Sequence, residues 1–256
     1  MILANVEAAR LLQKIRLPAP LRVHASPPAL KLEKLTEFLL AQGLKPRWRD
    51  HPEPRDFEQI VKDAQGHPAE HLIMAVLLRS QSLAVYKPEN QGHFGLALDA
   101  YTHFTSPIRR YPDLLVHRAI HHHLARGTRD NYRYTTNEMD RLCELSSHRE
   151  RRAEEASRDV ETRLKCLYMQ DHIGQVFSGT VAGVTSFGLF VELDHGNVSG
   201  LVHVTGLPND YYHFDPVRHS LTGERRGRVF QLADRLEVVV KDVNLADRKI
   251  DFELNE

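Results

Sequence analysis

Residues 93–117 read HFGLALDAYTHFTSPIRRYPDLLVH, and this stretch decides how the first part of the chain is interpreted. It places two adjacent arginines, Arg109 and Arg110, directly before a predicted helix that begins at Pro112. Proline suits a first helical position, because its missing N–H would have no partner there. The first turn of such a helix presents unpaired N–H groups and the positive end of the helix dipole. The two guanidinium groups beside it would form a site for a phosphate oxyanion.

A structural interpretation competes with this one. Asp113 follows Arg110 by three residues and can form an ion pair with one of the two arginines. The segment would then be a clamp that holds the turn, and the residue pattern by itself leaves both alternatives open.

The segment resembles the signature of the ribonuclease II and ribonuclease R family (the RNB family) of processive 3′→5′ exoribonucleases. The residues that carry the resemblance are His93, Phe94, Gly95, Tyr101, Phe104, Thr105, Ser106, Pro107, Arg109, Arg110, Tyr111, Asp113 and His117. The resemblance implies that Arg109 is the catalytic residue that contacts the RNA phosphate near the scissile bond. It also implies that Arg110, Tyr101 and Thr105 bind RNA or support the turn itself.

Residues 1–170 are predicted to be mainly helical. Prolines open the predicted helices, at Pro28, Pro54, Pro68 and Pro112. The helix after Pro68 is apolar on all sides, which is typical of a buried helix. Residues 83–86 and 93–98 are predicted strands, and the second is expected to have an unpaired edge.

A long helix is predicted to follow. Thr135-Thr-Asn-Glu138 is a capping-box pattern, and the helix that it starts reaches about Gln170. Its apolar residues recur at intervals of three and four, as an apolar stripe requires: Ala153, Ala156, Val160, Leu164 and Leu167. The charges between Arg149 and Lys165 alternate in sign, which is typical of a solvated face.

At Gly174 the sequence changes to short segments rich in β-branched residues. Five strands are predicted, at 175–184, 187–193, 200–204, 235–243 and 248–254. Five strands over about 80 residues fit a small closed barrel of the OB type. The predicted fold class is therefore α+β: a partial, helix-rich RNB catalytic domain over residues 1–170, followed by a five-stranded OB-type (S1) β-barrel over residues 174–256.

The barrel segment resembles an S1 domain, an RNA-binding module with the OB fold, through VTSFGLFV at 184–191 and GLVH at 200–203. Alternation places Phe187 and His203 on a face where RNA bases could stack, with Phe190 nearby. The same rings could instead form the barrel core.

Two further features belong to this module. Arg248 matches a basic position that is common in S1 domains and is predicted to bind RNA, whereas Asn244 stands where many such domains carry Asp. The aromatic segment 209–214 could extend the stacking face or pack its own loop.

Composition limits the class of protein. The net charge is zero, but it divides into −4 from Gly174 onward (8 Lys and Arg, 12 Asp and Glu) and +4 before it (26 against 22). RNA affinity should therefore come from individually placed arginines and stacking rings rather than from bulk attraction. No apolar run is long enough for a membrane span, and no signal peptide is recognisable. Two cysteines, Cys143 and Cys166, are not expected to form a disulfide, which fits a cytoplasmic protein.

The sequence lacks the metal-binding aspartates that the family resemblance implies. The family uses Mg²⁺ held by clustered aspartates, and hard cations need several carboxylate oxygens close together. No Asp-rich run occurs, since Asp99, Asp113 and Asp140 are scattered. The sequence is thus expected to be the C-terminal part of a longer enzyme, with its metal ligands before Met1. No small-molecule cofactor is evident.

Three hypotheses follow. The first is that the chain is part of an exoribonuclease that hydrolyses single-stranded RNA to 5′-nucleoside monophosphates. This chain alone would then bind RNA without degrading it. The second is a non-catalytic RNA-binding protein or adaptor. The third, a metal-binding regulator, rests on His117 and the run His121–His123. That run lies near the end of a predicted helix, where histidine favourably faces the negative end of the dipole, so no metal ligands are predicted.

Overall fold

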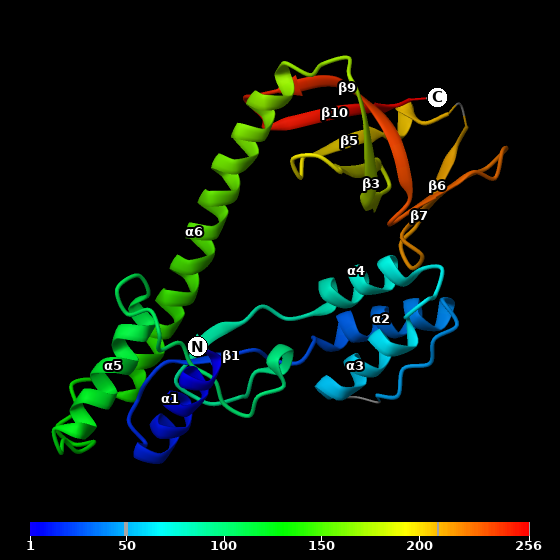
Figure 1. Ribbon diagram of the computed structural model, residues 1–256. Coiled ribbons are helices and arrows are strands. Elements are labelled where there is room, and N and C mark those ends of the chain that lie inside the picture. Colours follow the sequence, from blue (N-terminus) through cyan, green and yellow to red (C-terminus); the bar gives the residue numbers. More distant parts are fainter. Residues whose placement is uncertain (49–50, 209, 256) are drawn as a thin grey trace. The chain divides into compact units, whose positions relative to one another are not determined.

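The computed structural model describes residues 1–48, 51–208 and 210–255 (Figure 1). The chain divides into two compact units. The first unit comprises Met1–Glu33, Pro46–Lys62 and Leu77–Glu154, and the second comprises Lys34–Lys45, Asp63–Val76 and Glu155–Glu256. The domain limits expected from the sequence, 1–170 and 174–256, stay a prediction.

The helices are α1 (Ile2–Ile15), α2 (Ala29–Ala41), α3 (Pro54–Asp63), α4 (Glu70–Ser80), α5 (Tyr111–Leu124) and α6 (Thr136–Gln170). The helix starts expected at the prolines are confirmed to within two residues, and Pro112 lies in the first turn of α5. The prediction that the helix after Pro68 is buried on all sides is wrong, because Met74 and Leu78 of α4 are exposed. Only one side of this helix is therefore packed.

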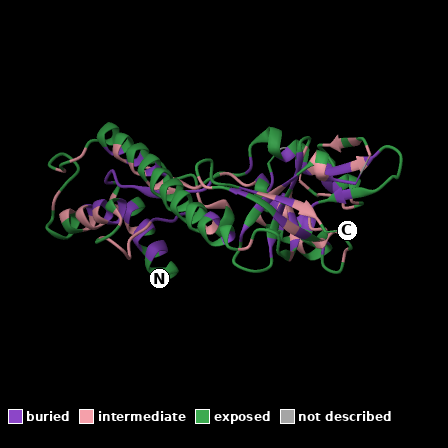
Figure 2. Cartoon of the chain, turned by 90° about the horizontal axis from the view of Figure 1, so that it is seen from above, coloured by how far each residue is buried: buried purple, intermediate pink, exposed green. Residues whose placement is uncertain are grey.

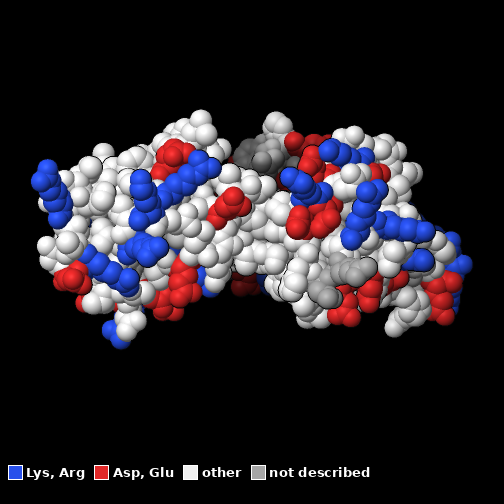
Figure 3. Space-filling view, turned by 90° about the horizontal axis from the view of Figure 1, so that it is seen from below, with Lys and Arg blue, Asp and Glu red and all other residues white. Residues whose placement is uncertain are grey.

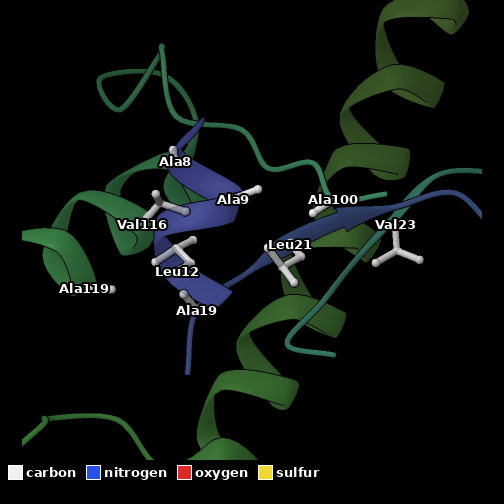
Figure 4. Close-up of a cluster of buried hydrophobic side chains, with 9 residues drawn as sticks. All are labelled: Ala8, Ala9, Leu12, Ala19, Leu21, Val23, Ala100, Val116 and Ala119. Atoms are coloured by element: carbon white, nitrogen blue, oxygen red, sulfur yellow. The ribbon is translucent and has the colours of Figure 1, made fainter. Parts of the chain in front are cut away.

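A small apolar core holds α1 against α5 in the first unit. Ala8, Ala9 and Leu12 of α1 meet Val116 and Ala119 of α5 (Figure 4). The same cluster takes in Leu21 and Val23 of strand β1 (Leu21–Val23), together with Ala19 and Ala100. The small alanine side chains let the two helices approach closely, and this packing fixes the position of the N-terminus of α5.

The predicted strand at 93–98 is wrong. Strand β1 pairs with β2 (Val85–Lys87), His93 forms isolated bridges with His24 and Leu98, and residues Phe94–Leu96 form a short 3-10 helix, η1. His24 causes this turn: its carbonyl oxygen accepts the N–H of Phe94 at 2.9 Å, and its Nδ1 accepts the N–H of Gly95 at 2.8 Å. The bond from Phe94 belongs to an isolated β-bridge between His24 and His93, and the 3-10 turn that follows prevents this bridge from extending into a strand ladder.

Helix α6 begins and ends where the sequence predicts. Thr135 and Glu138 form the capping box, with the N–H of Thr135 donating to Glu138 Oε2 at 2.8 Å and the N–H of Glu138 donating to Thr135 Oγ1 at 3.3 Å. The expected apolar stripe is not packed, because Val160 and Leu164 are exposed along with most of the middle of the helix (Figure 2).

The expected five-stranded barrel is confirmed in the second unit. Strands β3 (Val176–Thr185), β4 (Gly188–Leu193), β5 (Ser199–His203), β9 (Arg235–Asn244) and β10 (Lys249–Leu254) close in the order β10-β5-β4-β3-β9. The β5–β10 pair is parallel and closes the barrel. Leu189, Val202 and Phe252 fill its interior. Gly200 is needed at this closure, because a Cβ there would lie 2.5 Å from the ring of Phe252.

A second sheet, not foreseen from the sequence, lies between β5 and β9 along the chain. After the 3-10 turn η2 (Val204–Gly206), strands β6 (Tyr212–Asp215), β7 (Ser220–Gly223) and β8 (Val229–Gln231) form an antiparallel meander. Leu221 and Phe230 are buried on one side of it. The aromatic segment 209–214 thus contributes a strand, although Asn209 lies outside the described residues.

Both cysteines are free thiols, as expected, and both are buried. Burial raises the pKa of the Cys143 thiol to about 12. Among residues 1–48, 51–208 and 210–255, no helix combines the length and the apolar character that crossing a membrane requires.

Candidate functional site

A cleft of about 500 Å³ lies beside the two arginines of the signature segment. It is bounded by β2, by the first turn of α5 and by α6 within the first unit. Its lining includes Tyr86, Arg109, Arg110, Tyr111, Arg149 and Glu150. The cleft therefore brings together three arginines from two separate parts of the sequence.

Arg110 is committed to a structural clamp. Its Nε and Nη2 donate to the two carboxylate oxygens of Asp113 at 2.9 and 2.8 Å. The Asp113 side chain is 0% exposed and also accepts the N–H of Ser106 at 2.8 Å. The clamp anticipated as the competing interpretation thus applies to Arg110, and it joins the turn to the first turn of α5.

Arg109 lies in a different environment. Its backbone N–H donates to the carbonyl of Ser106, but its exposed guanidinium forms no hydrogen bond or ion pair with any described residue. The clamp formed by its neighbour holds the backbone at Arg109 in place. The result is a positioned but unengaged cation at the cleft.

Arg149 of α6 is a second such cation, which was not predicted from the sequence. Its side chain is exposed and has no polar partner in the described part of the chain. It lines the cleft together with Leu142, Leu145 and Ala153, at helical intervals of three and four. The spacing of these four residues could have indicated a packed face of the helix. The alternating charges instead favoured the interpretation that this part of the helix is fully solvated.

Neither Tyr101 nor Thr105 lines the cleft, and the role of each stays a prediction. Tyr101 is 8% exposed, and its hydroxyl accepts a hydrogen bond from Asn5 Nδ2 at 2.9 Å. The Asn5 Oδ1 atom accepts the N–H of Phe104 at 3.1 Å, next to the partly exposed Thr105. Asn5, from α1, is a buried anchor that no local sequence pattern singles out.

Aromatic and imidazole side chains pack behind the cleft. The hydroxyl of Tyr86 lies 2.8 Å from Nδ1 of His103, and burial raises the pKa of Tyr86 to about 12. Burial also lowers the pKa of His103 to about 4, and that of His93 to about 4. Both imidazoles are therefore neutral at pH 7. The positive charge of the cleft comes from its arginines.

The barrel carries an exposed aromatic pair. Phe187 and Phe190 are 46% and 38% exposed, and their rings meet edge-to-face at 5.9 Å. His203 lies on the same sheet face, opposite Gly188, and its exposed ring bonds to Thr205. Gly188 has φ +152°, and a Cβ there would lie 2.3 Å from the carbonyl oxygen of Val202. The absence of a side chain at Gly188 thus lets β4 and β5 approach each other closely beside these aromatic rings.

Arg248 is engaged within the second unit. Its guanidinium forms an ion pair with Asp159 of α6. Asn244 caps the adjoining turn, accepting the N–H of Asp247 at 2.9 Å. The basic position expected to meet RNA is thus largely neutralised by a nearby carboxylate.

Nothing in the described ranges fits a magnesium ion. No three His, Cys, Asp or Glu side chains gather closely enough there to hold a metal. His117 Nε2 lies 2.8 Å from the carbonyl of Phe104, and His122 Nε2 lies 2.9 Å from the carbonyl of Thr128. The two ring nitrogens are therefore occupied by backbone hydrogen bonds.

Charges of both signs are interspersed over the face seen in Figure 3. No broad area of one sign covers this face. A polyanion would therefore depend on individual unpaired bases, and Arg109 and Arg149 are two that line the same cleft.

Comparison with known proteins identifies a domain in the N-terminal part of the chain and another in the C-terminal part. Residues 1–126 match the RNB domain, and residues 170–255 match the S1 RNA binding domain. The chain therefore belongs to the RNB family and joins a stretch of RNB domain to an S1 domain.

Within that family the chain is similar to Ribonuclease R. It is 46% identical to Ribonuclease R of Vibrio parahaemolyticus and 47% identical to that of Escherichia coli, over 100% and 99% of the chain. It spans only 32% of the length of each. The apo form of Mycoplasma genitalium RNase R has a TM-score of 0.85 at 30% identity, over 100% of this chain and 40% of that one.

Proposed function

We propose that this chain is the phosphate-gripping and RNA-binding part of a 3′→5′ exoribonuclease that acts on single-stranded RNA. The observation that carries the proposal is the unpaired Arg109, held by the Arg110–Asp113 clamp at the edge of the cleft. A guanidinium fixed in this way can donate two hydrogen bonds to a phosphodiester as negative charge develops on it.

The barrel supplies the second contact of the proposal. The exposed rings of Phe187 and Phe190, with His203 beside them, offer faces on which bases can stack. The RNase R of Mycoplasma genitalium, similar over this whole chain, has a structure in complex with ribose methylated single-stranded RNA. The same protein also has a structure in complex with double-stranded RNA, so the likeness supports RNA as the ligand, and the stacking rings favour single strands.

Hydrolysis is proposed to need residues that the described part of this chain does not hold. In the complete enzyme, carboxylate-bound Mg²⁺ would supply the activated water, and 5′-nucleoside monophosphates would be released. The side chains described here fit the phosphate-binding role but not a magnesium site. These residues would therefore hold and orient the phosphate, and the chemical step would need other groups.

The test uses the purified 256-residue chain and a 5′-labelled single-stranded RNA. Binding is expected in EDTA, and Arg109→Gln is expected to weaken it by about tenfold, the loss of one charge-assisted contact. With Mg²⁺ added, the RNA is expected to stay intact. Stepwise shortening of the labelled RNA that Arg109→Gln abolishes would contradict the proposal of an inactive part. Absence of binding would contradict the RNA-binding function itself.

A further inference from the structure

The positive charges of the barrel domain are distributed very unevenly. Eight Lys and Arg residues lie from Gly174 onward, and four of them fall between Arg218 and Arg228. Three of the others are paired with carboxylates: Arg235 with Asp194, Lys241 with Glu253 and Arg248 with Asp159. A paired base gains little from a phosphate, because it must give up its carboxylate partner first.

Two adjacent unengaged bases lie in the turn between β7 and β8. The side chains of Arg225 and Arg226 form no hydrogen bond or ion pair with the described residues. Their backbone N–H groups, in contrast, donate to the carboxylate of Asp210, at distances of 2.8–3.1 Å. Asp210 therefore fixes the turn while leaving both guanidinium groups exposed to solvent.

An aromatic surface adjoins this turn. Tyr211 is 67% exposed, and its ring meets that of the exposed His213 at 5.0 Å. The backbone pairs Tyr211 with Glu224, next to Arg225. Strand alternation puts Tyr211 and His213 on the side of the sheet opposite to the buried Phe230 and Leu221.

We infer that this surface, formed by Tyr211, His213, Arg225 and Arg226, is a second binding site for single-stranded RNA. None of these four residues belongs to the Phe187–Phe190 pair or lines the Arg109 cleft. The two arginines would contact successive phosphates, while the neighbouring rings would stack with bases. The inference rests on the proposed function only in that the chain binds RNA.

The charges on this surface predict opposite effects on RNA affinity for different substitutions. Glu224 is its acidic member, with Oε2 at 3.6 Å from Nε2 of His213. A phosphate chain on this surface is repelled by Glu224 and attracted by Arg225 and Arg226. Removing the acid and removing the bases should therefore change RNA affinity in opposite directions.

The experiment measures the affinity of the full chain for a fluorescent 12-nucleotide oligouridylate between 50 and 200 mM KCl, in EDTA. For single strands each lost phosphate contact lowers the slope of log affinity against log salt by about 0.7. The double variant Arg225→Gln/Arg226→Gln is expected to lower the slope by about 1.4, while Glu224→Gln should tighten binding about two- to threefold. Tyr211→Ala should weaken binding about tenfold.

The matched control is Arg235→Gln/Lys241→Gln, which removes the same charge from two carboxylate-paired bases. It should leave the slope unchanged. If the double variant of the turn behaves like this control, the inference is overturned although RNA binding stands. If the unsubstituted chain does not bind, the proposed function fails instead. Equal loss of affinity for a duplex of the same length would overturn the assignment to single strands.

Discussion

The carboxylate of Asp113, completely buried, receives two hydrogen bonds from Arg110 and one from the backbone of Ser106. This arrangement divides the work of two adjacent arginines. Arg110 holds the turn, and Arg109 remains available to a ligand. The two roles can be separated by measurement, because one concerns the free energy of unfolding and the other concerns affinity.

Arg110→Gln is expected to lower the free energy of unfolding by about 3 kcal/mol, since it leaves a buried carboxylate without its cation. Arg109→Gln should change stability by less than about 0.5 kcal/mol, as an exposed side chain does. Urea denaturation followed by circular dichroism compares the two. Equal stability of both variants would rule out the clamp.

Arg149→Gln is expected to weaken single-stranded RNA binding, because Arg149 shares the cleft with Arg109. The loss of one phosphate contact should lower the salt slope by about 0.7. Arg152→Gln is the matched control, since this arginine lies one turn away on α6 and does not line the cleft. Identical effects of the two variants would show that α6 acts only through its overall charge.

The sequence predicted elements that depend on local signals. Prolines marked the starts of α3 and α5, and the Thr135–Glu138 pair marked the start of α6. Elements governed by distant contacts were missed. His24 turns residues 93–98 away from a strand through hydrogen bonds that span about 70 positions of sequence, and no local pattern contains that information.

The candidate site shows the same division. The signature segment identified Arg109 and Arg110 but could not assign them different roles, since both precede the same helix. Arg149 lines the cleft because of the way α6 packs in the folded chain. The ion pair of Arg248 with Asp159 likewise forms only in the folded chain. Charge partners of this kind are set by tertiary structure.

Acidification from pH 7 to pH 5 is expected to destabilise the first unit. Burial lowers the pKa of His93 and of His103 to about 4, whereas a histidine in the unfolded chain has a pKa near 6.5. Between these values the unfolded state binds more protons, so the free energy of unfolding falls as the pH falls from about 6.5 to about 4. Urea midpoints at pH 7.5, 6.5 and 5.5 measure this.

The control for the pH effect removes the imidazoles. His93→Gln and His103→Gln should each flatten the dependence of the urea midpoint on pH within this window. A wild-type midpoint that does not move between pH 7.5 and pH 5.5 would show that the two imidazoles are readily protonated in the folded state.

Phe190→Ala is expected to weaken RNA binding about tenfold through the loss of one stacking platform. Fluorescence anisotropy with oligouridylate tests this at constant salt. Tyr168→Ala serves as a comparison, because Tyr168 is an exposed ring on α6, outside the barrel. Equal effects of the two substitutions would indicate that exposed rings contribute without regard to position.

Gly188→Ala is expected to destabilise the barrel by about 3 kcal/mol or more, because two costs coincide. The residue has φ +152°, a conformation that L side chains rarely adopt, and the added Cβ would lie 2.3 Å from the carbonyl oxygen of Val202. That oxygen belongs to the neighbouring strand backbone and cannot move without breaking the β4–β5 ladder.

Gly206→Ala is the control, since nothing lies within 4 Å of a Cβ at that position. Thermal unfolding should therefore separate the two alanine variants by several degrees. A melting temperature for Gly188→Ala within a degree of that for Gly206→Ala would mean that β4 and β5 do not approach each other as described.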